Sequence, residues 1–287
     1  MYPDVLLEPR AKAPSVVALL GYLEPNSERP YDYAYPPPEG GPWHNYEGDP
    51  RPMRITDARG LPARSSLQRA GFELRDAPSQ VTDFLDEEAI RRTYYSETAE
   101  LACAATGAKQ AYVFDHLVRK REPGRPALTF GRRVAGDKPA ANGRVHNDYT
   151  EASGRQRLAL VLQDPDAAAA VRRHAIVNIW RSIAGPVLDT PLALCDARTV
   201  SAVDLVDSEV RYATRTGEIY LLRHSAQHRW FYFSAMERHE ALVFKQYDSE
   251  TSGVARFVPH AAFDHPQTPP EAPLRESIEV RCLVVYE

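Results

Sequence analysis

Two residues with metal-binding side chains stand close together in the segment Val145-His-Asn-Asp-Tyr-Thr150. Alternate residues of an extended chain share a face, so His146 and Asp148 would present an imidazole and a carboxylate side by side. Such a pair supplies two ligands of a two-histidine, one-carboxylate site for iron(II). A His-x-Asp pair also occurs by chance in solvated turns, so this interpretation needs a third ligand.

The third ligand is sought among five histidines of the C-terminal half, namely His224, His228, His239, His260 and His265. His260 fits best, because Arg256-Phe-Val-Pro-His-Ala-Ala-Phe263 has the composition of a strand and a Pro-rich turn follows it. It lies 112 residues after Asp148, which is a long separation. His228 and His224 therefore remain as alternatives.

Polar and apolar residues alternate near the C-terminus, in the order Arg275, Ser277, Ile278, Glu279, Val280, Arg281, Cys282 and Val284. An arginine fork can grip a carboxylate in two places, helped by a nearby hydroxyl group. Such a clamp could hold the distal end of a dicarboxylate such as 2-oxoglutarate while the other end chelates iron. We therefore expect Arg275 and Ser277 to bind 2-oxoglutarate; an exposed edge strand with surface ion pairs is the alternative.

Short strands separated by turn residues dominate the chain from about residue 127 to the end, which favours an antiparallel sandwich or barrel over a parallel sheet. Residues 84–107 have helical spacing of apolar residues, and Gly107 is a reasonable stop. A strand is predicted over Ser15–Leu23. The Pro-rich segment from Pro30 to Pro52 is expected to form an arm or lid, because proline disfavours regular helix and central strand.

These patterns predict a single domain over residues 1–287. Its expected parts are an N-terminal strand and Pro-rich arm (1–60), a helical support region (61–126) and a β core (127–287).

The composition excludes several classes of protein. With 287 residues, 43% of them hydrophobic and 26% charged, the chain can bury a core and is not expected to be disordered throughout. A formal net charge of -4 argues against nucleic acid or anionic membranes as partners. The three cysteines are far apart, and neither a membrane span nor a secretion signal is recognisable, so we expect a cytoplasmic protein.

The motifs together resemble a known family. His146-x-Asp148, His260 and Arg275-x-Ser277, in this order on a strand-rich C-terminal half, resemble the non-haem iron(II)/2-oxoglutarate-dependent oxygenases. The sequence around these motifs resembles the AsaB-type hydroxylase/desaturase family within these oxygenases, which includes gibberellin-desaturase-like, CmcJ and NvfI proteins. The similarity spans roughly residues 15–286 and includes Phe114-Asp-His116, His228-Arg-Trp-Phe-Tyr-Phe233, Glu240-Ala-Leu-Val-Phe-Lys-Gln-Tyr-Asp-Ser249 and Pro259-His-Ala-Ala-Phe263.

The resemblance implies a mainly β fold with flanking helices, a cupin-like double-stranded β-helix or jelly roll with iron at its mouth. It implies iron(II) ligation by His146, Asp148 and His260, with 2-oxoglutarate and O2 as cosubstrates. The expected reaction is hydroxylation, desaturation or oxidative cyclisation of a small molecule in specialised-metabolite biosynthesis, by an enzyme that is expected to be a homodimer. The alternatives are a cupin-like metal hydrolase or isomerase without 2-oxoglutarate, and a metal-free binding module.

Several other side chains have two interpretations. Four aromatic residues of predicted strands could line a substrate pocket, although such residues more often pack in a core: Trp180, Trp230, Tyr232 and Phe233. Lys245 and Arg281 could contact the near carboxylate of 2-oxoglutarate. Buried pairs with Glu240, Asp248 or Glu279 would explain these two cations equally well.

Overall fold

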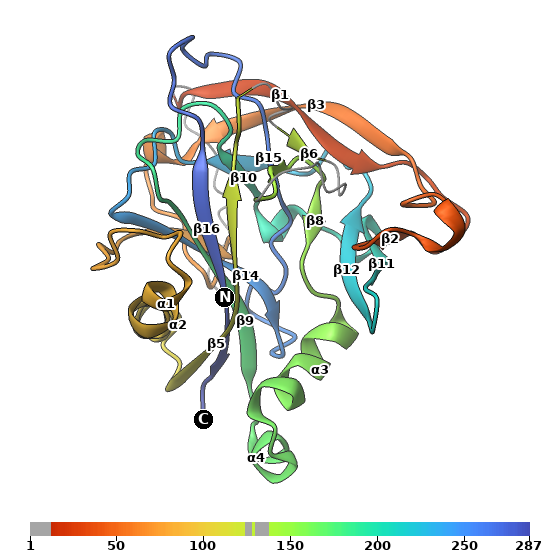
Figure 1. Ribbon diagram of the computed structural model, residues 1–287, viewed down its shortest axis with the longest axis vertical. Helices are drawn as coiled ribbons and strands as arrows, with labels where there is room; N and C mark the ends of the chain where they lie inside the picture. Colours follow the sequence, from red (N-terminus) through yellow and green to blue (C-terminus); the bar gives the residue numbers. More distant parts are fainter. Residues whose placement is uncertain (1–12, 124–127, 130–137) are drawn as a thin grey trace.

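Two β-sheets dominate the computed structural model, which describes residues 13–123, 128–129 and 138–287 (Figure 1). The nine-stranded sheet consists, in spatial order, of β1 (Ser15–Leu23), β3 (Gly48–Asp57), β13 (Trp230–Tyr232), β10 (Leu192–Cys195), β15 (His260–Ala262), β8 (His146–Asn147), β12 (Thr216–Leu222), β11 (Leu205–Arg211) and β2 (Tyr31–Tyr33). The five-stranded sheet consists of β4 (Phe72–Asp76), β14 (Glu240–Asp248), β9 (His174–Ser182), β16 (Glu276–Val285) and β5 (Gln110–Lys120). A separate short pair is formed by β6 (Leu128–Thr129) and β7 (Ala141–Asn142).

The last strand, β16, has the two faces that its sequence predicts. The apolar face of β16 consists of Ile278, Val280, Cys282 and Val284. These side chains pack with Tyr94 and Ala102 of the helical segment beside the five-stranded sheet. Because side chains alternate along a strand, Ser277, Glu279 and Arg281 lie on the opposite face. This face is largely buried as well, so its charged groups need partners inside the protein.

One apolar cluster joins the two sheets. It combines side chains of β4, β9 and β14 with side chains of β10 and β13, and its largest members are Phe72, Trp180, Leu194, Phe231, Phe233 and Phe244. Trp230 and Tyr232 lie in a second cluster with residues of β1 and β3. The four aromatic residues considered above are therefore core residues, and Trp180 also borders the cavity described below.

The N-terminal part contributes strands to both sheets. The strand predicted over Ser15–Leu23 is confirmed as β1. The expectation that the Pro-rich segment contains no central strand is wrong at its end, because Pro50 and Pro52 belong to β3, which lies between β1 and β13. These prolines pair with β1 alone, whereas β13 pairs with β3 only at residues 55–57, so their missing N–H groups interrupt no second ladder. The expected boundary at residue 127 lies outside the described residues, and β4 and β5 precede it.

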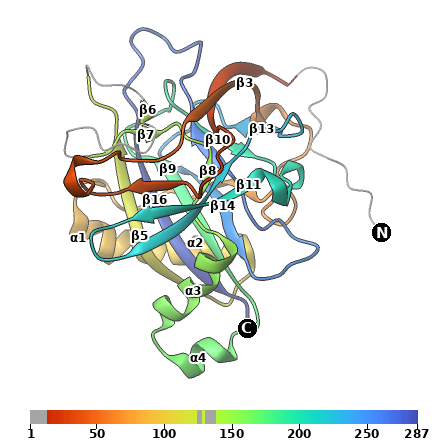
Figure 2. The ribbon, with the colours of Figure 1, turned by 90° about the vertical axis from the view of Figure 1, so that its right-hand side faces the viewer.

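Helices flank the sheets (Figure 2). The helix predicted over 84–107 is confirmed as α1 (Glu87–Ala89), a π turn and α2 (Tyr95–Thr106), which ends at Gly107 in a left-handed conformation. Two helices, α3 (Glu151–Leu162) and α4 (Pro165–Ala170), were not predicted, and they lie together at the lower end of both ribbon views. Among the described residues no helix is long and apolar enough to cross a membrane.

Helix α3 follows the His-x-Asp segment directly. Thr150 caps its first turn through a reciprocal pair of hydrogen bonds with Ser153. Gly154 packs against the ring of Tyr247 on β14, where a Cβ atom would lie 2.4 Å from a ring carbon. Only glycine allows this close approach, which holds the helix against the five-stranded sheet.

Candidate metal centre

Strand pairing brings the two distant histidines together. His146 on β8 is the cross-strand partner of His260 on β15, and the centroids of their rings are 4.4 Å apart. Asp148 follows two residues after His146, and its Oδ1 lies 3.4 Å from Nε2 of that histidine. One ligand atom from each of the three residues lies within 4.8 Å of the other two. This group of donors fits one metal ion.

Both imidazoles are oriented by backbone carbonyl groups. Nδ1 of His146 lies 2.8 Å from the carbonyl oxygen of Arg144, and Nδ1 of His260 lies 3.3 Å from that of Val258. If each Nδ1 carries the proton, each Nε2 keeps a lone pair for a metal. Burial, together with His146, lowers the pKa of His260 to about 3, so this ring is neutral at physiological pH.

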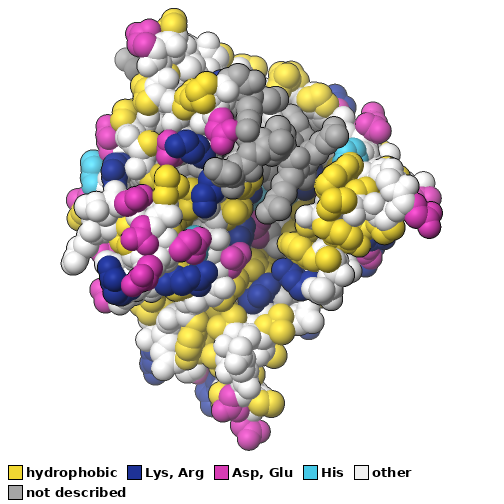
Figure 3. All heavy atoms as spheres, in the orientation of Figure 1, with side chains coloured by type: hydrophobic (Ala, Val, Ile, Leu, Met, Phe, Trp, Pro, Cys, Tyr) yellow, Lys and Arg dark blue, Asp and Glu magenta, His cyan; other side chains and the backbone are white. Residues whose placement is uncertain are grey.

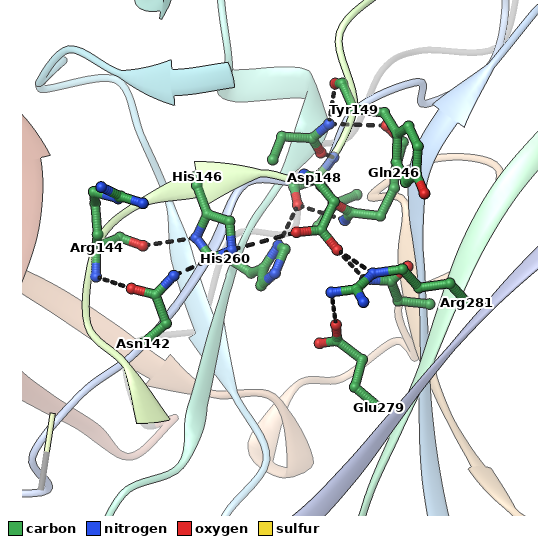
Figure 4. A network of polar contacts seen from close by, with 12 residues as sticks. Asn142, Arg144, His146, Asp148, Tyr149, Gln246, His260, Glu279 and Arg281 are labelled. Carbon is green, nitrogen blue, oxygen red and sulfur yellow. Dashed lines mark hydrogen bonds and ion pairs between the residues drawn. The ribbon is translucent and has the colours of Figure 1, made fainter. Parts of the chain in front are cut away.

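The carboxylate is oriented in a similar way (Figure 4). Its Oδ2 accepts hydrogen bonds from Nε of Arg281 at 2.9 Å and from Nδ2 of Asn178 at 2.8 Å, which leaves Oδ1 toward His146. Burial alone would raise the pKa of Asp148. Arg281 and the two histidines outweigh burial and hold that pKa well below its usual range, so the group is ionised.

Two buried amides fix the backbone around the donors. Asn147 donates hydrogen bonds to the carbonyl oxygens of Gln246 and Tyr149, and its Oδ1 accepts one from the N–H of Val258. The side chain of Gln246 accepts a hydrogen bond from the N–H of Asp148 at 2.7 Å. The sequence reasoning missed both residues, although Asn147 lies inside the His-x-Asp motif and points away from its face.

A small cavity lies between two of the donors, His146 and His260, and Arg275 of the predicted clamp. It is bordered by His146, His260, Trp180, Arg119, Arg275 and Glu279, among others. The Arg275 guanidinium donates to Oγ of Ser277 and to the carbonyl oxygen of Thr190, and it lies over the ring of Trp180. It forms no ion pair with a carboxylate of the described residues. Burial, and next the neighbouring Arg119, lower the pKa of Arg275 to about 9.

The other candidates lie elsewhere or have partners. His228 contacts the Tyr22 hydroxyl and the Asp204 carboxylate, and the ring of His224 packs edge-on against Tyr22. Neither histidine belongs to the group of metal donors. The ammonium group of Lys245 donates to the Asp248 carboxylate at 2.6 Å, a buried ion pair that explains this lysine.

Arg281 joins three carboxylates. Besides Asp148, it donates to Glu279 and Asp115, each at 2.8 Å. The second interpretation of Arg281, a buried pair with Glu279, therefore holds, and the contact with Asp148 was not anticipated. His116, which follows Asp115 in the chain, contacts Tyr95 and Glu87.

Replacing Arg281 with glutamine is expected to raise the lowest pH at which the protein still binds iron(II). Arg281 lowers the pKa of Asp148, so removal of its charge raises that pKa. A carboxylate with a depressed pKa stays ionised until the pH falls through that value, so the variant should lose binding first as the pH falls. Anaerobic iron(II) titrations at decreasing pH check this, and equal acid limits in both proteins would contradict it.

Comparisons with known proteins agree with this geometry. A family described as "Oxidoreductase/YMDC permease-like domain" matches residues 20–285. The chain is 34% identical to the Fe(II)/2-oxoglutarate-dependent dioxygenase nvfI of Aspergillus novofumigatus (strain IBT 16806), over 88% of this chain and 89% of the relative. It is 32% identical to the hydroxylase/desaturase CTB9 of Cercospora beticola, over 91% and 88%. The chain belongs to this oxidoreductase family.

The solved structures extend the similarity to the fold. The iron and alpha-ketoglutarate-dependent endoperoxidase NvfI superimposes with a TM-score of 0.82 at 27% identity, covering 96% of this chain and 99% of that one. The expected jelly-roll class is confirmed. The expected class of enzyme, an iron(II)- and 2-oxoglutarate-dependent dioxygenase of the hydroxylase/desaturase family, is confirmed as well.

Proposed function

We propose that this protein oxidises a small organic molecule with iron(II) held by His146, Asp148 and His260, using 2-oxoglutarate bound through Arg275. The observation that carries the proposal is the continuity of the site. Two of the three donors, His146 and His260, border the cavity that also borders the buried Arg275 guanidinium, and this guanidinium forms no ion pair with a described carboxylate. Burying an unpaired cation raises the free energy of the folded protein unless a bound anion pairs with it.

The charges around the cavity fit the two groups. Three guanidinium groups, those of Arg119, Arg275 and Arg281, border the cavity. Arg281 is paired with carboxylates, whereas Arg119 and Arg275 form no ion pair with a described residue, so a dianion such as 2-oxoglutarate could offset their charge. The two-histidine, one-carboxylate donor set is the one used by non-haem iron(II) oxygenases.

The residues of the chain orient and shield the reactants. Bound iron(II) supplies, with 2-oxoglutarate and O2, the oxidising power needed to break a C–H bond. Ser277 holds the Arg275 fork in place through two 3.2 Å contacts to its Oγ, and the apolar side chains of Trp180, Leu192 and Ala262 line the cavity and limit its water. Hydroxylation, desaturation and ring closure all begin with this C–H step.

Anaerobic titration tests the proposal. Iron(II) followed by 2-oxoglutarate should produce a weak visible charge-transfer band at about 500 nm, and this band should require both additions. Admission of O2 should then yield succinate. Bound iron without the band would favour a metal enzyme that does not use 2-oxoglutarate. Absence of iron binding by the folded protein would favour a metal-free binding module.

We also propose that residues 1–287 form one oxygenase domain that acts in the cytoplasm as a homodimer. The single domain is supported by the sheets, since β1 and β15 share one sheet and β4 and β16 share the other. The Pro-rich segment contributes β2 at the end of the nine-stranded sheet, and Arg29 just before it borders the cleft that leads to the metal donors. The homodimer is proposed because two-fold dimers are the commonest assemblies among soluble homo-oligomers.

A further inference from the structure

A large open cleft leads from solvent to His146 and Asp148, and arginines are prominent in its walls. Figure 3 shows basic side chains gathered around the hollow in the middle of this face. Three of the cleft arginines are neutralised by carboxylates: Arg29 by Glu209 and Glu218, Arg144 by Asp32, and Arg281 by Asp148, Asp115 and Glu279. The remaining three, Arg119, Arg157 and Arg215, form no ion pair with another described residue.

These three arginines differ in their surroundings. Arg119 donates to the carbonyl oxygen of Ala140 and also borders the inner cavity, next to Glu279. Arg215 is exposed and lies 4.0 Å from the ring centre of its neighbour Tyr212. Arg157, on α3, is partly buried like Arg119, but it borders the open cleft and not the inner cavity.

Aromatic rings hold the Arg157 guanidinium in place. Its Cζ lies 4.8 Å from the ring centre of Phe114 and 5.6 Å from that of Tyr149, and these two rings pack edge to face. Arg157 and Tyr149 line the same open cleft as two of the metal donors, His146 and Asp148. Its Nε is buried and has no hydrogen-bond partner among the described residues.

Packing alone does not account for this arginine. A leucine or methionine would cover the Phe114 and Tyr149 rings without the cost of desolvating a charged N–H group. A guanidinium held by contacts with two rings in this cleft, with no carboxylate partner among the described residues, is positioned to bind a planar anion.

We propose that Arg157 binds a carboxylate of the organic substrate, so that the enzyme acts on an organic acid. This inference rests on the proposed function, because it takes the cleft beside the metal donors to be the substrate site. Arg157 is then a specificity-determining residue, and it holds the acid group of the substrate over the Phe114 and Tyr149 rings, at the side of the metal site.

A matched pair of probes tests this. 3-Phenylpropionate and its neutral amide are titrated, by ligand-observed NMR, into anaerobic protein loaded with iron(II) and saturated with 2-oxoglutarate. Wild-type protein should prefer the acid, and Arg157→Met should weaken acid binding about tenfold while leaving amide binding unchanged. Arg155→Met is the control, because Arg155 is exposed on the same helix and pairs with Glu151 outside the cleft lining.

The outcomes separate the two proposals. Equal binding of acid and amide by wild-type protein, or equal acid binding by wild type and Arg157→Met, overturns the role of Arg157. An equal loss in Arg155→Met also overturns it, since that result would reflect the general charge of the helix. Failure of the same wild-type sample to bind iron(II) or 2-oxoglutarate would instead contradict the proposed function.

Discussion

Asp148→Asn should weaken iron(II) binding by about 100-fold or more while the protein stays folded. The variant keeps the shape of the side chain but removes the only carboxylate among the three described donors. Loss of a group that merely orients a metal ligand typically costs 10- to 100-fold in affinity, so loss of a ligand should cost at least as much. Anaerobic calorimetric titration with iron(II) measures the change, and circular dichroism checks the fold.

Asp115→Asn is a matched control for this variant. Asp115 contacts the same guanidinium as Asp148, that of Arg281, but it is half exposed and is not one of the metal donors. The control should therefore bind iron(II) like wild-type protein. Equal losses in the two variants would mean that Asp148 acts only through the charge of Arg281. His228→Ala should also leave iron binding unchanged, because its ring is engaged by Tyr22 and Asp204.

The features that were predictable from sequence are local ones. The shared face of His146 and Asp148 follows from the two-residue period of an extended chain, and so does the polar face of β16 with Ser277. Residues 84–107 have a strong helical periodicity followed by a glycine stop, and the structure contains a helix there that ends at Gly107. In each case the signal lies within about twenty residues, where backbone geometry decides the arrangement.

The features that were not predictable depend on tertiary packing. His260 and His228 are similar as isolated histidines, and only the pairing of β15 with β8 selects the former. Helix α3 was missed because Ser, Gly and Arg interrupt its apolar pattern, while its stability comes from the Thr150 cap and the contact of Gly154 with β14. The prolines of β3 are tolerated because their neighbours leave one side of that segment unpaired within the sheet.

Arg275→Met should raise the dissociation constant for 2-oxoglutarate by a factor on the order of 100, because two charged hydrogen bonds are lost. Iron(II) binding should be unchanged, since Arg275 contacts none of the three donors through an ion pair or hydrogen bond. Ser277→Ala should have a smaller effect, because the charge remains and only its orientation loosens. Arg121→Met is the control, since Arg121 pairs with Asp189 beside Arg275 without bordering the cavity.

A second ligand separates a direct contact from a general effect of charge. Pyruvate has the 2-oxo acid group that chelates iron but lacks the distal carboxylate, so wild-type protein should bind 2-oxoglutarate far more tightly. In Arg275→Met this preference should largely disappear, because the variant and the smaller ligand remove the two halves of one interaction. If the preference persists there and disappears in Arg119→Met, the distal carboxylate lies against Arg119, the other guanidinium that borders the cavity without a carboxylate ion pair.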